Sequence, residues 1–310
     1  MYDPPCAICG SVRVPAATHD VRDYVTGDRF TVARCRECGY GVTAPRPPSL
    51  DRYYPARYRG FNPLAAMVLR RLYRRRVDGW VRRLPRPGVA LEIGSGTGWM
   101  LKALRDHGWR AVGSERDIDA ARIAQRRSGA PMFVGGLDAL RREPFLDLVV
   151  LFHVLEHLPD PIPVIRGLAA VVKPGGTLVL GLPNGASWQC RFAGRHWMHL
   201  DVPRHLVHFT PDSIERALVS SGFRVTEFAF TSFEHDPLGW VQGTLDRLGF
   251  EQALILKRLI GLREGRAGLL ATAAAFVLAI PLGVIGLGLA VVSWSAGAGA
   301  VMQVWAVREP

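Results

Sequence analysis

From Gly88 onward the chain alternates short apolar runs with stretches of helical periodicity. The apolar runs are VALEIG, RAVGSE, LDLVVLF and TLVLGLP, and WMLKALRDHG, DAARIAQRR and VIRGLAAVV lie between them. Strands that alternate with helices form parallel sheets, because each helix carries the chain back to the same edge. The alternation therefore predicts an α/β core with a doubly wound parallel sheet. A further helix, PDSIERALVSSG with Thr210 as its N-cap, and the strand FRVTEFAF extend this core.

The chain has 310 residues, which suffices for one such core with small appendages but not for two large domains. The proline-rich stretch APRPPS marks a boundary near residue 48, because proline continues neither a helix nor a central strand. We expect five segments: a cysteine-containing ribbon at 1–48, a basic helical linker at 49–85, the core at 86–239, a helical insert at 240–297 and the last strand of the core at 298–310.

The net charge of +12 at pH 7 favours negatively charged partners. Arginines crowd the stretch from Arg52 to Arg86, where Asp78 is the lone acid. This cluster is either a face that binds an anion or the solvated face of a helix. Anionic lipid, nucleic acid and a phosphorylated substrate all fit the first interpretation.

Four of the five cysteines form two Cys-x-x-Cys pairs, each followed by glycine: Cys6, Cys9, Cys35 and Cys38. Zinc prefers four thiolates in a tetrahedron, and each short pair supplies two of them from one turn. The spacing predicts a structural zinc ribbon, because four protein ligands leave no open position. The alternative is a set of reduced or redox-active thiols, and we interpret Cys190 as an ordinary buried thiol. Unpaired thiols, and an amino terminus without a secretory pattern, indicate a reducing, cytoplasmic compartment.

The segment LEIGSGTG places Glu92 two residues before Gly94, followed by Gly96 and Gly98, where a strand turns into a helix. Glycine lets the backbone bend sharply there and approach a ligand closely. A dinucleotide-binding fingerprint would need glycine at position 99, which Trp99 occupies. Glu115 ends the next strand, where a carboxylate can accept hydrogen bonds from both hydroxyls of a ribose.

These segments, with LDLVVLFHVLEHLPDP, KPGGTLVLGLPN and DVPRHLVHFTP, resemble the class I S-adenosylmethionine-dependent methyltransferases. The branch that is most similar includes ubiquinone-biosynthesis O-methyltransferases and sugar C-methyltransferases, over residues 86–235 and the last ten. The resemblance implies a Rossmann-like, seven-stranded sheet and S-adenosylmethionine as cofactor. It implies that the methionine part lies on the loop of Glu92, Gly94, Ser95, Gly96 and Gly98, that the ribose lies on Glu115, and that the adenine lies near Asp138. Relatives often have an acid directly after the glycine at 135, whereas this chain has Gly136.

Histidines supply the candidate base, because a hydroxyl or activated carbon must lose a proton during methyl transfer. His153 and His157 follow the fourth strand of the core, at the edge where open α/β sheets bind ligands. We choose Glu156 and His157 as the catalytic pair, because this sequence resembles sugar C-methyltransferases at these two residues. The alternative is that His157 caps a helix and pairs with Glu156 structurally. His205 lies in the excursion RHWMHLDVPRHLVHF, which we expect to form a lid. The candidate catalytic residues are His157, Glu156, His153 and His205.

Residues 269–292 carry no charge and are long enough to cross a bilayer. Pro281 and Gly283 divide them into two halves of about 12 residues, each roughly 18 Å long as a helix, which favours a hairpin entering one leaflet. The β-rich end AVMQVWAVRE must return to the sheet, and basic residues precede the hairpin. We therefore expect monotopic or peripheral attachment to an anionic membrane surface, on its cytoplasmic face. The alternative is a buried helix pair or a dimer interface.

The sequence thus predicts a methyltransferase acting on a hydroxyl or carbon of a lipid-associated or glycosidic acceptor, which is a small molecule, a sugar or a lipid-linked compound. One alternative is a zinc-ribbon module that binds nucleic acid. We disfavour nucleic acid as a partner, because an apolar hairpin serves no purpose on it. The other alternative is a scaffold that binds the cofactor without turnover.

Overall fold

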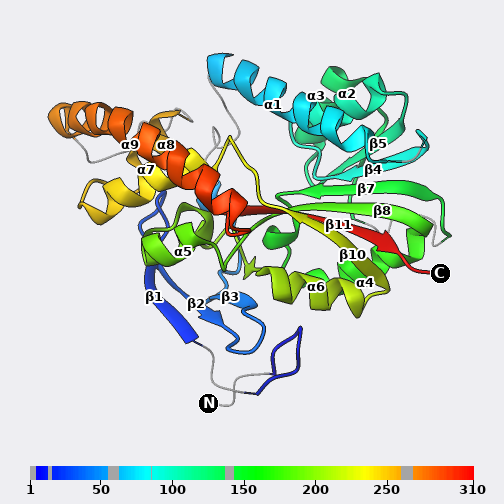
Figure 1. The fold of residues 1–310 in the computed structure, drawn as a ribbon, viewed down its shortest axis with the longest axis horizontal. Helices are drawn as coiled ribbons and strands as arrows, with labels where there is room; N and C mark the ends of the chain where they lie inside the picture. Colours follow the sequence, from blue (N-terminus) through cyan, green and yellow to red (C-terminus); the bar gives the residue numbers. More distant parts are fainter. Residues whose placement is uncertain (1–4, 13–15, 55–62, 85, 137–142, 260–267) are drawn as a thin grey trace.

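The computed structural model describes residues 5–12, 16–54, 63–84, 86–136, 143–259 and 268–310. A seven-stranded sheet forms the centre of the molecule, in the order β10-β11-β8-β7-β4-β5-β6 (Figure 1). Its strands are β4 (Val89–Ile93), β5 (Arg110–Glu115), β6 (Met132–Val134), β7 (Leu146–Phe152), β8 (Val172–Pro183), β10 (Phe223–Ala229) and β11 (Val301–Arg308). The pairs from β6 to β8 are parallel, and β11 runs antiparallel to both β8 and β10. The predicted Rossmann-like architecture, including a last strand supplied by the chain's end, is confirmed.

Helices cover both faces of this sheet, which is why its central strands are apolar throughout. One face carries α1 (Pro63–Val81), α2 (Trp99–Asp106) and α3 (Ile118–Ser128), and the other carries α4 (Pro161–Val171) and α6 (Pro211–Val219) (Figure 1). Thr210 caps α6 by accepting a hydrogen bond from the Ser213 backbone, as the sequence predicted.

The expected linker at 49–85 is in part a layer of the core. Val77 and Trp80 of α1 are buried with Leu101 and Leu104 of α2 against the sheet. Arg70, Arg71, Arg74 and Arg75 therefore lie on the exposed side of a helix whose other side packs on the core, whereas Arg76 faces inward.

The amino-terminal segment forms a second, smaller sheet of order β1-β2-β3-β9. Its first strands are β1 (Ala16–Arg22), β2 (Arg29–Arg34) and β3 (Gly41–Ala44), and the short 3-10 helix η1 (Asp51–Tyr53) follows them. The fourth strand, β9 (Val207–His208), comes from the core. The ribbon is thus joined to the core by backbone hydrogen bonds, not only by the chain.

A long excursion between β8 and α6 supplies β9. It contains α5 (Trp188–Ala193) and the 3-10 helices η4 (Gly194–His196) and η5 (Met198–Leu200). Trp197 and Leu200 are buried together with Val21 and Phe30 of the ribbon. Ribbon and excursion therefore share one small apolar core.

The insert before β11 consists of α7 (Asp236–Arg247), α8 (Leu254–Leu259) and α9 (Leu269–Ser295). The expected hairpin within 269–292 is wrong, because α9 continues through Pro281 and Gly283 as one helix. A proline removes a single backbone hydrogen bond, at a cost of about 3 kcal/mol, whereas a turn would remove several. α7 packs closely along α9: a Cβ added at Gly286 would lie 3.2 Å from the Cβ of Trp240.

Asp236, at the start of α7, holds the end of α9 in place. Its Oδ2 accepts hydrogen bonds from Trp294 Nε1 at 2.7 Å and from the Ala300 backbone nitrogen at 3.0 Å. The far side of α9 is exposed: Val277, Ile280 and Val284 retain 67%, 72% and 73% of their accessible surface. Within the described residues, α9 is the one helix long and apolar enough to cross a membrane, and 17% of its apolar window is buried.

Candidate active site

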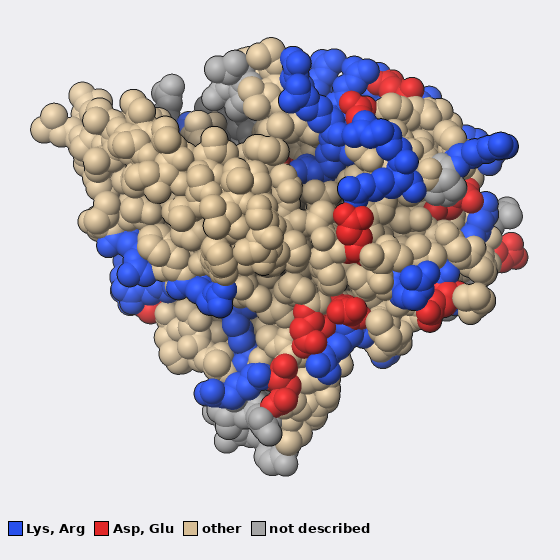
Figure 2. Space-filling view, in the orientation of Figure 1, with Lys and Arg blue, Asp and Glu red and all other residues tan. Residues whose placement is uncertain are grey.

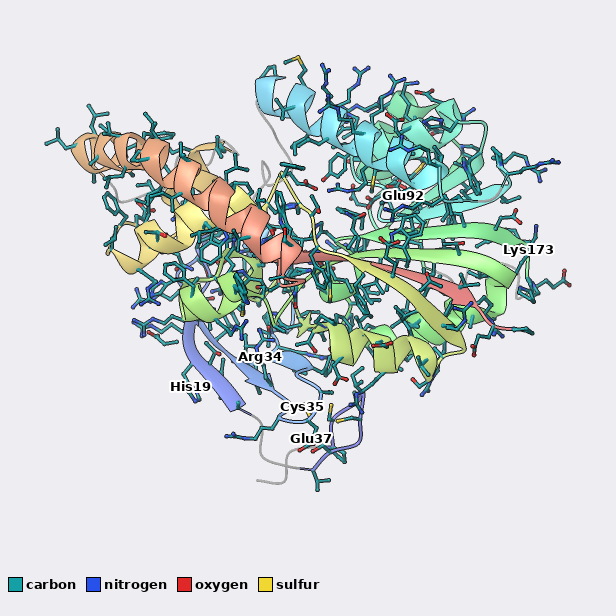
Figure 3. The ribbon with its side chains drawn as sticks, in the orientation of Figure 1. His19, Arg34, Cys35, Glu37, Glu92 and Lys173 are labelled. Carbon is teal, nitrogen blue, oxygen red and sulfur yellow. The ribbon has the colours of Figure 1, made fainter. Side chains whose placement is uncertain are left out.

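The candidate site lies at the carboxyl edge of the sheet, between β4 and β7. The strand order reverses there, because β5 and β6 extend the sheet on one side of β4 and β7 and β8 on the other. Ligands of open α/β sheets bind where two successive loops diverge in this way. Figure 3 shows Glu92 near this edge and Lys173, at the start of β8, at the opposite edge.

The loop after β4 takes a shape that side chains would prevent. Gly94, Gly96 and Gly98 have φ values of 69°, 53° and 74°, in the left-handed region that favours glycine. A Cβ at Gly94 would lie 2.4 Å from Val154 Cγ2, and one at Gly98 would lie 2.8 Å from the Ala124 carbonyl oxygen. The predicted loop is therefore packed directly against the segment that follows β7.

Two buried carboxyl groups flank the loop. Burial, and then the neighbouring charge of Glu115, raise the pKa of Glu92 to about 8. Glu92 Oε2 has no hydrogen-bond partner in the described part of the chain. Glu115 Oε1 accepts a hydrogen bond of 2.5 Å from the Gly96 backbone, and its Oε2 accepts one from Arg116 at 3.2 Å. Two closely spaced buried acids favour a ligand with positive charge and several donors.

S-adenosylmethionine fits this pair, because it offers an ammonium group, a sulfonium and two ribose hydroxyls. The orphaned Glu92 oxygen and the glycine cradle are the observations on which this fit rests. The Ser95 hydroxyl donates to the Glu92 carbonyl oxygen at 3.1 Å, so Ser95 shapes the loop from within. Asp138, the candidate for the adenine, lies outside the described residues.

His153 and Glu156 form a hydrogen-bonded pair directly after β7. His153 Nδ1 lies 3.0 Å from Glu156 Oε1, and the backbone of His153 has a left-handed φ of 54°. Burial alone would raise the pKa of Glu156, but the hydrogen bond from His153 and the nearby histidine charges hold it at about 2. The carboxylate is therefore ionised and accepts a hydrogen bond from Nδ1–H, so that the lone pair of a neutral His153 ring lies on Nε2.

The hydrogen bond of His157 goes to the excursion and not to Glu156, which argues against the alternative of a structural pair. His157 ends the 3-10 helix η3 (Leu155–His157), and its Nδ1 donates to the Arg204 carbonyl oxygen at 2.9 Å. The ring of His205 lies 4.8 Å from it, between centroids. Burial, followed by the charge of His205, lowers the pKa of His157 to about 4. His157 is therefore neutral at pH 7.

His205 comes to the same place from the excursion. Its Nδ1 donates to the His199 carbonyl oxygen at 2.9 Å, which leaves Nε2 as the ring nitrogen that faces the cluster. One ligand atom from each of Glu156, His157 and His205 lies within 4.8 Å of the others. Two histidines and a carboxylate at this spacing could hold a divalent cation. All four candidate catalytic residues thus lie together.

Sequence reasoning gave no role to three further residues of the site. His235 is half-buried, with its ring 4.8 Å from His153 and 5.5 Å from His199. Arg76 of α1 forms an ion pair with Glu234 and stacks 4.5 Å above the Phe152 ring. A signal for His235 was present, because it follows β10, whose carboxyl end lies at the same edge of the sheet.

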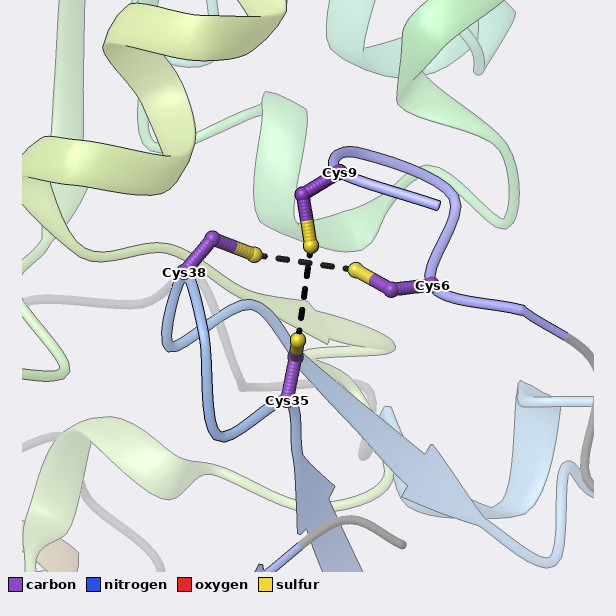
Figure 4. Close-up of side chains that lie close together, drawn as sticks. All are labelled: Cys6, Cys9, Cys35 and Cys38. Carbon is purple, nitrogen blue, oxygen red and sulfur yellow. Dashed lines mark hydrogen bonds between the residues drawn. The ribbon is translucent and has the colours of Figure 1, made fainter. Parts of the chain in front are cut away.

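The four cysteines of the ribbon converge as predicted (Figure 4). The Sγ atoms of Cys6 and Cys38 are 3.6 Å apart, as are those of Cys9 and Cys35. Zinc–sulfur bonds of about 2.3 Å in a tetrahedron place the sulfurs about 3.8 Å apart. The cluster therefore fits a zinc ion. Thr210, the cap of α6, donates to the Cys38 carbonyl oxygen at 2.7 Å and ties this cluster to the core.

Comparison with known proteins agrees with this geometry. A methyltransferase-domain family model matches residues 68–227. The fold and the site define an S-adenosylmethionine-dependent methyltransferase, and the chain belongs to this methyltransferase-domain family.

The matched region covers a different share of each curated relative. A ubiquinone biosynthesis O-methyltransferase of Xanthomonas campestris pv. campestris is 26% identical over 162 residues, which are 49% of this chain and 67% of the relative. An uncharacterized methyltransferase of Mycobacterium leprae is 31% identical over 137 residues, which are 42% of this chain and 49% of the relative. A solved putative methyltransferase of Bacillus halodurans C-125 has the same fold, with a TM-score of 0.50 and 14% identity over 76% of this chain and 99% of its own.

Proposed function

We propose that the enzyme methylates a hydroxyl or carbon of a small-molecule, sugar or lipid-linked acceptor, with His153 as the base. The observation that carries this proposal is a set of buried polar atoms without partners among the described residues: His153 Nε2, Glu156 Oε2 and His199 Nε2. Buried polar atoms are rarely left unpaired, so such a cluster indicates a place for a polar ligand. Val154, which follows His153, contacts the cofactor loop, so this place adjoins the cofactor.

S-adenosylmethionine supplies a methyl group on a positively charged sulfur, which is a good leaving group. The protein aligns the acceptor and excludes water, and the excursion contributes His199 and His205 to this edge of the sheet. His153 Nε2 accepts the proton that the acceptor loses, and Glu156 stabilises the resulting imidazolium through Nδ1. Glu156 is thus a positioning residue, while His157 and His205 line the same pocket.

The relatives support part of the acceptor assignment. Several of them are named ubiquinone biosynthesis O-methyltransferases, which favours a lipid-linked acceptor and transfer to oxygen. Transfer to carbon remains an alternative, because both reactions need a base and an aligned acceptor.

A second mechanism uses the same cluster differently. Glu156, His157 and His205 would hold a divalent cation that lowers the pKa of an acceptor hydroxyl. Titration with Mn²⁺, followed by electron paramagnetic resonance, separates the two mechanisms. One bound Mn²⁺ beyond the cysteine cluster, lost in His205→Gln, favours the cation; no such binding favours the base alone.

The exposed side of α9 supports our proposal of membrane attachment. β11 follows α9 and lies inside the sheet, and α7 packs along α9, so both flanks of the helix belong to one globular body. This arrangement favours a helix lying on the cytoplasmic face of a membrane rather than crossing it. After high-speed spinning without detergent, full recovery in the soluble fraction would contradict attachment.

The activity is tested with S-adenosylmethionine labelled on its methyl group. The wild-type protein is incubated with a lipid extract or with an aqueous extract of the source cells, and the label is counted in each extract. We expect label in the lipid extract and a loss of about 100-fold or more in His153→Gln. A variant with Arg166→Gln on α4 is the matched control. Equal transfer by wild type and His153→Gln would contradict the assigned base, and tight cofactor binding without transfer would indicate a scaffold.

A further inference from the structure

Four arginines on successive turns of α1 have no counterion. Arg70, Arg71, Arg74 and Arg75 are exposed, and no ion pair or hydrogen bond involves them within the described ranges. Their neighbours Arg76 and Arg83 are paired, with Glu234 and Glu227. The sole acid of α1, Asp78, is engaged by His107 Nε2 at 2.7 Å. Figure 2 shows the basic side chains gathered over α1.

These arginines line an open groove of about 680 Å³, with Trp99 on its other side. Arg127 of α3 adds a fifth guanidinium from a separate element. It is held in place, because it donates to the Thr97 carbonyl oxygen at 2.9 Å and lies 5.4 Å from the centroid of the Trp99 ring. Guanidinium groups from two elements therefore converge on one groove.

The repulsion between these closely spaced guanidinium groups destabilises the protein unless an anion neutralises them. Like charges four residues apart destabilise a helix, and Arg70 lies four residues before Arg74, as Arg71 does before Arg75. Arginine binds phosphate oxygens in pairs through its planar fork. A volume of about 680 Å³ suits a phosphate or diphosphate group with part of the molecule that carries it. An extended nucleic-acid backbone would instead require a basic path across the surface.

The groove also adjoins the cofactor loop. Trp99 is the first residue of α2 and directly follows Gly98 of the cofactor loop. We infer that this groove binds the phosphate or diphosphate group of a molecule that the enzyme uses at its active site or meets at a lipid surface. The phosphate would belong to the acceptor, or to the lipid surface, of the methyl transfer proposed above, so the inference rests on that proposed function. A phosphate bound in the groove would orient the acceptor, or the bilayer, relative to the cofactor.

The test uses the full chain and two probes, inorganic pyrophosphate and lipid vesicles, with duplex DNA as the competing ligand. Calorimetry measures pyrophosphate binding to wild type, to the double variant Arg70→Gln/Arg74→Gln and to the matched control Arg166→Gln/Arg224→Gln, whose arginines lie on α4 and β10. We expect saturable binding to wild type, weakened by about tenfold or more in the groove variant and by less than about twofold in the control. Binding of S-adenosylhomocysteine should be the same in all three proteins.

Vesicles of phosphatidylcholine, with and without phosphatidylglycerol, distinguish the sources of the phosphate. Pyrophosphate binding that is lost in the groove variant supports a diphosphate-bearing acceptor. Binding only to the anionic vesicles, lost in the same variant, supports a lipid headgroup. Equal losses in groove variant and control, or tighter binding of duplex DNA than of either probe, would overturn the inference. Absence of S-adenosylhomocysteine binding would instead refute the proposed function, so the two failures are distinguishable.

Discussion

The hydroxyl of Thr43, in strand β3 of the ribbon, donates a 2.7 Å hydrogen bond to the carbonyl oxygen of His205 in the active site. The same hydroxyl lies 2.9 Å from His208 Nε2, which donates to it. Both contacts are buried, and they join segments more than 160 residues apart in the chain. The ribbon therefore positions a residue of the catalytic cluster.

Replacing Thr43 with valine keeps the shape but leaves two buried polar groups unsatisfied. We expect a loss of about 1–3 kcal/mol in the free energy of unfolding and a fall in kcat that exceeds any change in KM. Chemical denaturation and steady-state kinetics measure these effects. Thr31→Val, in the same ribbon but at an exposed contact with His19, is the control and should change neither quantity. Wild-type kcat in Thr43→Val would contradict the positioning role.

The cysteine cluster should bind one zinc ion per chain, with the ribbon's stability depending on it. Removal of the metal by a chelator should lower the thermal midpoint and the activity together. The reason is that the ribbon that holds Cys38 also carries Thr43, whose hydroxyl contacts the active-site residue His205. Elemental analysis and thermal unfolding provide the measurement. Cys35→Ser should lose the metal, whereas Cys190→Ser should retain it. A metal-free protein with unchanged midpoint and activity would refute a structural zinc site.

Local patterns predicted most of the architecture. The alternating runs located the strands, and the glycines of the cofactor loop with Glu92 and Glu115 were recognised because strand, turn and helix are contiguous there. Contacts between distant segments could not be predicted in this way. The pairing of β3 with β9 and the approach of His235 to His153 depend on where the excursion and β10 pack. Proline misled the interpretation of α9, because tertiary packing along α7 outweighs one missing hydrogen bond.

Glu92 should lower the stability of the cofactor-free protein at neutral and higher pH. Its pKa is about 8 in the folded state against an ordinary value of 4.5, because of burial and the charge of Glu115. The folded state therefore keeps a proton that the unfolded state releases, and stability falls as the pH rises from 4.5 to 8. Glu92→Gln should be more stable than wild type at pH 8, by on the order of a few kcal/mol, and equal to it at pH 4.

The same substitution should weaken binding of S-adenosylmethionine, because a carboxylate facing a cationic ligand is lost. Thermal unfolding at several pH values, with and without the cofactor, tests both effects. If Glu92→Gln were less stable than wild type at pH 8 without cofactor, burial of the Glu92 carboxylate would not destabilise the folded protein.

Asp236 offers a comparison of charge with hydrogen bonding. Burial raises its pKa to about 7, so its contribution to stability decreases as the pH rises from 3.8 to 7. Asp236→Asn keeps an oxygen for the donors of Trp294 and Ala300 and should remove this pH dependence at little cost. Asp236→Ala should lose about 2–4 kcal/mol of unfolding free energy. Equal unfolding curves for the two variants would contradict the assigned role of these hydrogen bonds.

The account depends most on the identity of the ligand held between the glycine loop and Glu115. Calorimetry with S-adenosylhomocysteine and with NAD, on wild type and Glu115→Ala, measures this directly. We predict saturable binding of S-adenosylhomocysteine to wild type, binding at least about tenfold weaker in Glu115→Ala, and no binding of NAD. Saturation by NAD without binding of S-adenosylhomocysteine would contradict the assignment of the cofactor site.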